Sequence, residues 1–310
     1  MILTVTANSA LDRVLFIDEF QPGVTMRPHK MVESVGGKGF DASVVLQTLG
    51  VENMALGFVA GLTGRQLVKL LNGYGIPHDL VWVDGETRIA HVVVETWHHR
   101  HSHLIAAGLS VSSDAYQTLL ERYRTYLRQA MWVIVGGSLA AGVPVSCYRH
   151  LVEVAQEIGV PVLVDSFGPP LLEALSARPA ILKMNRDEFA QSFGIQTKTL
   201  ADLAAEAQDL YEHEPLSALV ITCGVEGVLA LTPEGTYLAV APAQQAVNAA
   251  GAGDSVSAAL TWRFSRGDDW PEALRWAAAT GAAVALTEGT ADCCLIDIER
   301  ILPQTDVQSE

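Results

Sequence analysis

The chain has 310 residues, of which 49% are hydrophobic, and it carries a formal net charge of −15. A chain of this size and composition can bury a large core, which excludes a disordered protein. The acidic balance argues against nucleic acid or an anionic membrane as the main partner, because both favour clustered Lys and Arg.

Signals for other compartments are missing from the sequence. The N-terminus lacks the basic segment of a signal peptide, and no apolar run reaches the roughly 18 residues of a membrane span. The four cysteines have neither metal-type spacing nor the pattern of a disulfide framework, and the adjacent Cys293 and Cys294 suit ordinary packing. We therefore expect a cytoplasmic protein.

Short apolar runs alternate with segments of helical periodicity along most of the chain. The expected strands are Met1–Ala7, Trp132–Gly136, Pro161–Val164, Ile181–Met184 and Ala218–Thr222. The expected helices are Phe40–Leu49, Arg65–Tyr74, Ser112–Gln129, Cys147–Glu157 and Leu200–Glu212. This alternation predicts an α/β fold with a mostly parallel sheet that helices cover on both faces. The polar C-terminal residues are expected to fray.

Two β-rich segments, Val14–Pro22 and Arg88–Trp97, have no helix after them. They predict a small sheet that projects from the main one. The apolar face of such a sheet needs a cover, either a closed binding site or a second subunit.

A glycine-rich turn enters a helix at Gly251-Ala252-Gly253-Asp254. Free amides and the positive end of the helix meet there, which favours the binding of anionic oxygens. Asp254 lies in the first turn, where we expect the local field to favour its ionised form. The turn alone leaves two roles open for Asp254, a helix cap and a catalytic base.

This turn resembles the C-terminal signature of the PfkB/ribokinase family of carbohydrate kinases. Further segments match in the order of the family: Gly36-Gly-Lys38-Gly39, Gly137-Ser138-Leu139, Asn185-Arg-Asp-Glu188 and Thr222-Cys-Gly224-Val-Glu-Gly227. Together they cover nearly the whole chain. Asn8–Asp12, Thr87–Ile89 and Asn248 are most similar to the branch of phosphosugar kinases, which includes 1-phosphofructokinase, tagatose-6-phosphate kinase and the minor 6-phosphofructokinase.

The resemblance implies one ribokinase-like domain over residues 1–310, with a β lid from strands at about 12–35 and 86–105. It also implies ATP and Mg²⁺ as cofactors, a phosphosugar of the fructose 1-phosphate, fructose 6-phosphate or tagatose 6-phosphate class as acceptor, and a homodimer through the lid. Two alternatives stay open: a kinase of an unphosphorylated sugar, polyol or nucleoside, and a catalytically silent sugar-binding or regulatory protein.

On the donor side, the resemblance makes Asp254 the base and the amides of Gly251, Ala252 and Gly253 an anion hole. The implied nucleotide-binding residues are Lys183, Asn185, Thr222, Gly224, Gly227 and Gly281, and the implied metal-binding residues are Glu188, Asn185 and Asp165. Asp165 also ends an expected parallel strand, where ligands gather in open α/β sheets. Ordinary alternatives are a solvated first-turn acid for Glu188 and plain helix packing for Gly281.

On the acceptor side, the implied substrate-binding residues are Asp12, Gly36, Gly37, Lys38, Asp41, Arg88, Arg27 and Ser138. Lys38, Arg27 and Arg88 are the cations available for a substrate phosphate, and Arg88 suits it best because a guanidinium can bind phosphate with two hydrogen bonds. A surface ion pair is the plain alternative for each Arg.

The sequence departs from the branch at two places, both on the acceptor side. Asp41 stands where the branch usually has Asn, and a charged Asp41 would repel a sugar phosphate by about 4 kcal/mol at 4 Å and an effective dielectric near 20. The tract Trp97–His103 replaces a usual Thr-Glu-Ile-Asn-like stretch. His101 and His103 would share one face of a strand, where they could bind substrate or a metal, or form an exposed hairpin tip.

Overall fold

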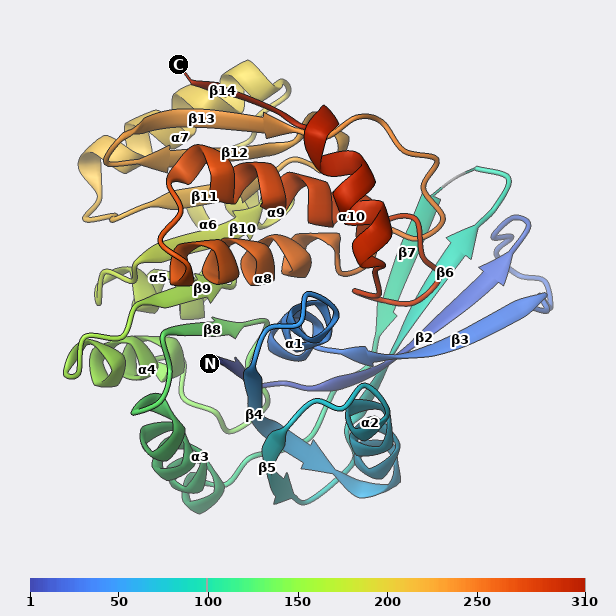
Figure 1. The fold of residues 1–310 in the computed structure, drawn as a ribbon. Helices are drawn as coiled ribbons and strands as arrows, with labels where there is room; N and C mark the ends of the chain where they lie inside the picture. The colour runs from blue at the N-terminus through green and yellow to red at the C-terminus, as the bar shows by residue number, and fades with distance from the viewer. Residues whose placement is uncertain (99, 310) are drawn as a thin grey trace.

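The computed structural model describes residues 1–98 and 100–309 (Figure 1). Within them, one large sheet has the strand order β14-β13-β12-β11-β10-β9-β8-β1-β4-β5. All pairs from β5 to β11 are parallel, and β12, β13 and β14 add antiparallel strands at one edge. The strands are β1 (Ile2–Thr6), β4 (Asn53–Ala60), β5 (His78–Val83), β8 (Trp132–Gly136), β9 (Val162–Asp165), β10 (Ile181–Asn185), β11 (Leu219–Thr222), β12 (Val228–Thr232), β13 (Gly235–Val240) and β14 (Asp306–Ser309).

Helices cover both faces of this sheet, as the alternating pattern predicts. One apolar core joins the sheet to α3 (Ser113–Leu127), α4 (Cys147–Gln156), α5 (Gly168–Leu175), α6 (Arg186–Phe193) and α7 (Leu200–His213). The core on the opposite face joins it to α1 (Lys38–Thr48), α8 (Ala252–Ser265), α9 (Trp270–Val284) and α10 (Leu295–Ile301). The remaining helix, α2 (Gly61–Gly73), packs with α1 in a third cluster. No helix of the described chain is both long and apolar enough to cross a bilayer.

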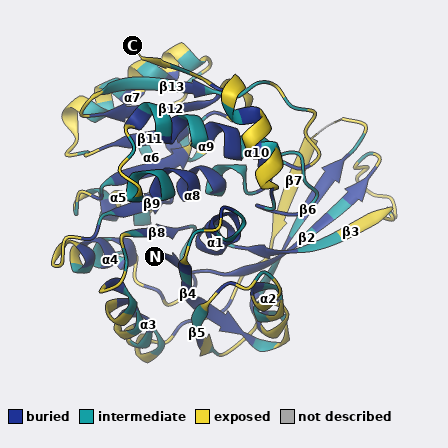
Figure 2. Cartoon of the chain, in the orientation of Figure 1, coloured by how far each residue is buried: buried dark blue, intermediate teal, exposed yellow. Residues whose placement is uncertain are grey.

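A second sheet projects from the body of the molecule, as expected (Figure 1). Its order is β3-β2-β6-β7, with β2 (Ala10–Ile17), β3 (Lys30–Gly36), β6 (Arg88–Glu95) and β7 (Arg100–Ile105). We refer to it as the small sheet. One face of it is apolar and buried, and Val14, Phe16, Val92 and Val94 pack there with Ala250. The edge strand β7 is exposed along its whole length (Figure 2).

The register of the large sheet brings distant parts of the sequence into one row. Thr6 pairs with Gly136, Gly136 pairs with Asp165, and Asp165 pairs with Lys183. This row lies at the carboxyl ends of the parallel strands, where open α/β sheets bind their ligands. The small sheet starts at the same edge, because only three residues separate β1 from β2.

The C-terminus differs from the sequence prediction. Residues Asp306–Ser309 do not fray but form β14, which pairs with β13. A polar sequence can serve as an edge strand because the backbone supplies the hydrogen bonds and one side of the strand faces solvent. The sequence pattern also missed β4, β5, β12 and β13, as well as α5 and α10.

Candidate active site

A chain of ion pairs lies at the carboxyl edge of the large sheet. The buried Lys183 on β10 donates to Asp165 Oδ2 at 2.6 Å. Lys38, at the start of α1, donates to Asp165 Oδ1 at 2.8 Å and to Glu188 Oε1 at 2.6 Å. Ser257 of α8 adds a hydrogen bond to Asp165 Oδ2 at 2.8 Å. Strands β9 and β10 and helices α1 and α8 thereby meet at one carboxylate.

The charges of this network stabilise one another. Burial alone would raise the pKa of Asp165, but Lys183 and Lys38 lower it below its usual value. Burial likewise opposes the charge of Lys38, yet Asp165 and Glu188 raise its pKa above the ordinary range. Lys38 therefore belongs to the ion-pair network, which corrects its expected place opposite a substrate phosphate. The physical reason is that two carboxylates converge on its ammonium group.

The turn before α8 presents free amides at its centre. Gly251 adopts a left-handed conformation with φ of 83°, which a side chain disfavours, and caps α8 without a side-chain hydrogen bond. Ala252 N donates to Ala249 O at 3.2 Å, whereas the amides of Gly251 and Gly253 have no partner among the described residues. The ammonium of Lys183 lies against Gly253, since a Cβ there would be 3.3 Å from it. The two free amides and the Lys183 ammonium thus form a place at which an anion can bind.

A buried amide holds this turn in place. Asn248 Nδ2 donates to Glu288 O at 3.1 Å, and Asn248 Oδ1 accepts from Ala250 N at 3.1 Å. The loop before α8 is thereby joined to the loop after α9. Gly281 of α9 packs against the same turn, because a Cβ at this position would lie 3.4 Å from Ala252 O.

Asp254 stands in the first turn of α8, as predicted, but its pKa is shifted in the direction opposite to the expectation. Burial, with Asp165 and Glu188 nearby, raises the pKa of Asp254 to about 7, although Lys183 and Lys38 oppose the shift. The loss of solvent thus outweighs the helix field that the sequence pattern suggested. A carboxyl group with this pKa suits a proton acceptor that works near neutral pH.

A second group of polar residues lies where the small sheet leaves the large one. Arg88 Nη2 donates to Asn8 O at 3.2 Å and approaches Ser138 Oγ at 3.5 Å. Asn8 Nδ2 donates to Ser138 Oγ at 3.1 Å. The buried atoms Arg88 Nε and Asn8 Oδ1 have no partner among the described residues. Buried polar atoms without partners are uncommon, so this group indicates a binding site.

Asp12 faces Arg88 across the same region. Burial raises the pKa of Asp12 to about 7, while the Thr290 hydroxyl and Arg88 lower it. A Cβ at Gly36 would overlap the carboxyl group of Asp12, so the glycine makes room for this side chain. Gly37, with φ of 108°, forms the N-cap of α1 directly beside it.

Asp41 is buried in the first turn of α1, and its Oδ1 atom has no partner within the described residues. Burial raises the pKa of Asp41 well above its ordinary value, and the carboxylates of Asp254 and Asp12 raise it further. These surroundings oppose the charge that the sequence pattern suggested for Asp41. An isolated carboxylate loses much of its hydration energy when it is buried in this way.

A cation site is supported by one pair of carboxylates rather than by a dense cluster. Asp165 and Glu188 already converge on the Lys38 ammonium, so their oxygens can serve a shared cation. Groups of three or more metal-type side chains are not found in the described residues. Mg²⁺ keeps several waters and takes few protein ligands, so two carboxylates can suffice for it. Asn185 Oδ1 accepts from Glu188 N at 2.8 Å, so Asn185 caps α6.

The remaining predicted nucleotide residues lie along the same edge. Thr222 ends β11, and its hydroxyl would be 3.9 Å from a Cβ at Gly253. Gly224 and Gly227 form the turn between β11 and β12. All the predicted donor-side residues thus reach one region.

Arg27 lies apart from the other acceptor residues. It is exposed in the connection between β2 and β3, beyond the pair Phe16–Lys30 at the outer end of these strands. Asp12 pairs with Ser34 four residues closer to the base, a span of about 14 Å at strand spacing. The structure therefore does not bring Arg27 to the pocket of its own chain.

The His tract extends the face of the small sheet that carries Asp12. His101 and His103 pair with Val94 and Val92, and their rings meet edge to face at 5.3 Å. Partial desolvation lowers the pKa of both imidazoles, which disfavours the cationic form that a phosphate would need. His99 lies outside the described residues.

Sequence reasoning missed three side chains that support the site. Ser257 bonds Asp165 and lies one helical turn after Asp254, a spacing that could have indicated it. Tyr148 donates to the carbonyl oxygens of Gly136 and Gly137 at 2.8 and 2.9 Å. Thr290 lies beside Asp12. No sequence signal marks the latter two, because only the folding of distant segments brings them to the edge.

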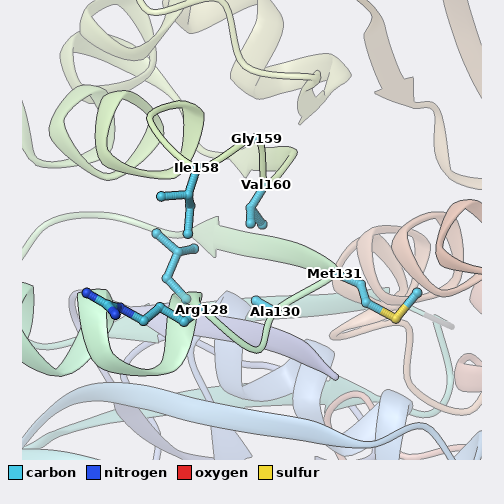
Figure 3. A pocket seen from close by; sticks show the side chains of 7 residues that line it. Arg128, Ala130, Met131, Ile158, Gly159 and Val160 are labelled. Carbon is cyan, nitrogen blue, oxygen red and sulfur yellow. The ribbon is translucent and has the colours of Figure 1, made fainter.

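An open hollow elsewhere on the surface is separate from this region (Figure 3). It is lined by the segments that precede β8 and β9, including Arg128, Met131, Ile158 and Val160. These segments lie at the amino ends of the strands, the opposite edge of the sheet from Asp165 and Asp254. The hollow is therefore no part of the candidate active site.

The fold and this site define a carbohydrate kinase. The model of the pfkB family carbohydrate kinases matches residues 3–297, and the chain belongs to this family. It is 32% identical to D-tagatose-1-phosphate kinase of Bacillus licheniformis over 96% of both chains. It is 29% identical to 1-phosphofructokinase of Bacillus subtilis over 99% of both chains.

Solved structures agree with this assignment. A possible 1-phosphofructokinase of Thermotoga maritima superposes with a TM-score of 0.89 and 28% identity, covering 100% of this chain and 99% of the other. Phosphofructokinase-2 of Escherichia coli, in complex with potassium, gives a TM-score of 0.86 at 25% identity, over 97% and 98% of the two chains. The predicted family and ribokinase-like fold are confirmed.

Proposed function

We propose that this protein is an ATP-dependent kinase that phosphorylates a hydroxyl group of a phosphosugar. The observation that carries this proposal is the half-buried Arg88, whose Nε has no partner among the described residues while Nη2 contacts Asn8 and Ser138. A guanidinium held in this way suits a phosphate group of the acceptor. The names of the relatives, tagatose-1-phosphate kinase and 1-phosphofructokinase, support the same substrate class.

Asp254 is the proposed base. The attacking hydroxyl gives its proton to Asp254, its oxygen forms a bond to the γ-phosphorus of ATP, and the bond from that phosphorus to the β,γ-bridging oxygen breaks. ADP leaves with the electron pair of this bond. The free amides of Gly251 and Gly253, with Lys183 beside them, stabilise the charge on the transferred phosphoryl group. Thr222, Gly224 and Gly227 border the nucleotide in this proposal.

Glu188 and Asp165 are the residues that would hold Mg²⁺, with Asn185 orienting Glu188 through its capping hydrogen bonds. The ion would neutralise negative charge on the ATP phosphates. Lys38 now occupies the space between the two carboxylates and supplies the positive charge there. A cytoplasmic location is part of this proposal, because that is where ATP is available.

The small sheet is the proposed lid and dimer contact. Outside its buried cluster it exposes apolar side chains, and Met31, Leu104 and Ile105 are each more than half exposed. Met31 and Leu104 lie on one face of the sheet and Ile105 on the other. A second sheet packed on the first of these faces would cover Met31 and Leu104, and pairing at the open edge of β7 would cover that edge (Figure 2). A dimer of this kind could also bring Arg27 of one chain to the acceptor of the other. A mass that stays monomeric at all concentrations in light scattering would contradict it.

The test is ADP release from Mg-ATP with a panel of sugar phosphates, free sugars, polyols and nucleosides. We expect turnover of a ketohexose phosphate and none by Asp254→Asn. Turnover of uncharged acceptors alone would contradict the phosphate role of Arg88 and favour the alternative kinase. Absence of turnover, with sugar binding in calorimetry, would support a silent binding protein instead.

A further inference from the structure

The carboxyl groups of Asp41 and Asp254 lie within hydrogen-bonding reach of one another, although they come from different helices. Each is in the first turn of its helix, α1 for Asp41 and α8 for Asp254. Two carboxylates cannot form a hydrogen bond with each other, since neither has a proton to donate. One proton on the pair changes this repulsive contact into an attractive one.

A backbone hydrogen bond from Gly37 lowers the pKa of Asp41, but the surroundings otherwise offer little to an anion. The residue is 4% exposed, and Oδ1 has no hydrogen-bond partner among the described residues. Lys38, three residues earlier on the same helix, turns toward Asp165 and Glu188. No ion pair in the described chain includes Asp41. Its carboxyl group is therefore enclosed without a cation, beside another acid.

The position of the proton follows from the difference between the two acids. Asp254 has Lys183 and Lys38 nearby, and both favour its charged form. Asp41 faces Asp254 from α8 and Asp12 from β2, and both disfavour its charged form. Tyr74, which follows α2, also interacts electrostatically with Asp41. Burial raises the pKa of its phenol to about 12, so Tyr74 stays neutral below that pH. The proton belongs on Asp41.

We propose that Asp41 is a neutral carboxylic acid in the folded protein and donates a hydrogen bond to the Asp254 carboxylate, which positions the base. Asp41 then offers one donor and one acceptor, the same hydrogen-bonding capacity as an amide that uses one N–H. A phosphosugar next to it meets no additional charge. The proton of Asp41 is not consumed, since the substrate proton goes to Asp254. The positioning role rests on the proposed kinase function, whereas the protonation of Asp41 does not.

The first experiment measures stability and needs no substrate. An unfolded Asp ionises near pH 3.9, whereas Asp41 in the folded protein would keep its proton, so the wild type loses stability as the pH rises above that value. Asp41→Asn removes this loss. We expect the melting temperature of the variant, relative to wild type, to increase steadily from pH 4 to pH 7.

The matched control is Asp187→Asn, which changes an exposed first-turn acid of α6. Its difference from wild type should show no such increase with pH. For Asp41→Asn, a difference that is constant or falls with rising pH would mean that Asp41 is ionised, and it would overturn the proposal whether or not the protein is a kinase.

The second experiment measures kcat/KM with the acceptor found in the panel, as a function of pH. Asp41→Asn should stay within about threefold of wild type at pH 7, since the amide also donates to Asp254. It should lack the alkaline decline that follows loss of the Asp41 proton. Asp41→Ala should lose at least about tenfold. Equal losses in the Asn and Ala variants would contradict the positioning role, because a neutral donor would then not replace the native group.

Discussion

The two halves of the candidate site differ in how completely their polar groups are paired. On the donor side, Lys183, Lys38, Asp165 and Glu188 form a closed network of ion pairs. On the acceptor side, Arg88 Nε, Asn8 Oδ1 and Asp41 Oδ1 are buried without partners in the described chain. The donor side is thus organised before a ligand arrives, whereas the acceptor side has hydrogen-bonding groups that a ligand would satisfy.

The supporting elements explain this difference. The donor groups stand on β9, β10, α1 and α6, which pack into the two cores on the faces of the large sheet. Apart from Asp41 on α1, the acceptor groups stand at the ends of β1 and β8 and on the small sheet, where one strand edge is exposed. Phosphoryl transfer from the same donor needs a rigid donor site. Specificity for a different acceptor needs changes in only a few side chains at the edge.

The largest expected effect comes from removing the proposed base on the donor side. Asp254→Asn should lower kcat by roughly 10³-fold, because the amide cannot take the proton of the hydroxyl. The melting temperature should fall little or increase, since an uncharged group replaces a buried acid. Steady-state ADP release checks this. Asp187→Asn is the control, and comparable losses in both variants would rule out a special role for Asp254.

The next largest effect tests whether the stability of the donor side depends on its ion pairs. Lys183→Met should reduce the free energy of unfolding by about 3 kcal/mol, because it leaves the buried Asp165 with one cation instead of two. Adding Asp165→Asn should recover part of this loss. Urea unfolding of the single and double variants measures it. An unchanged midpoint in the single variant would show that the network adds no stability.

The acceptor side should respond in binding rather than in stability. Arg88→Met should raise the KM for a phosphosugar by about 10- to 100-fold, since it removes a charge-assisted hydrogen bond to the phosphate. The KM for ATP and the melting temperature should change little. Initial-rate kinetics with both substrates separate these effects. Equal increases in both KM values would remove the distinction between the two halves.

The smallest effect is a pH dependence within the range of normal assays. The pKa of Asp254 is raised to about 7, so kcat/KM should fall as the pH drops through that value and the base becomes protonated. The pKa of Asp12 is also raised to about 7. If an Asp12→Asn variant still shows the fall of kcat/KM at low pH, this fall is assigned to Asp254. If Asp12→Asn shifts the pH at which kcat/KM falls, the fall is assigned to the acceptor side.

Much of the fold followed from local patterns. Short apolar runs with helices between them predict parallel strands, and the five segments from Gly36 to Asp254 predict the family. The pattern failed at β14, whose polar residues Asp306–Ser309 are held by backbone pairing with β13. It also failed to find β4 and β5, although β4 pairs with the N-terminal strand. Pairing between distant segments leaves no local signal.

The sequence by itself determined the class of reaction through the family's motifs in their order, whereas the glycine-rich turn alone predicted only a site for anionic oxygens. Only the tertiary structure decided the charges and directions of the side chains. Lys38 turns to Asp165 and Glu188 because these carboxylates meet at the strand ends. Asp41 and Asp254 have raised pKa values because folding removes their water and places acids beside them. A pKa depends on neighbours in space, and these neighbours are far apart in the sequence.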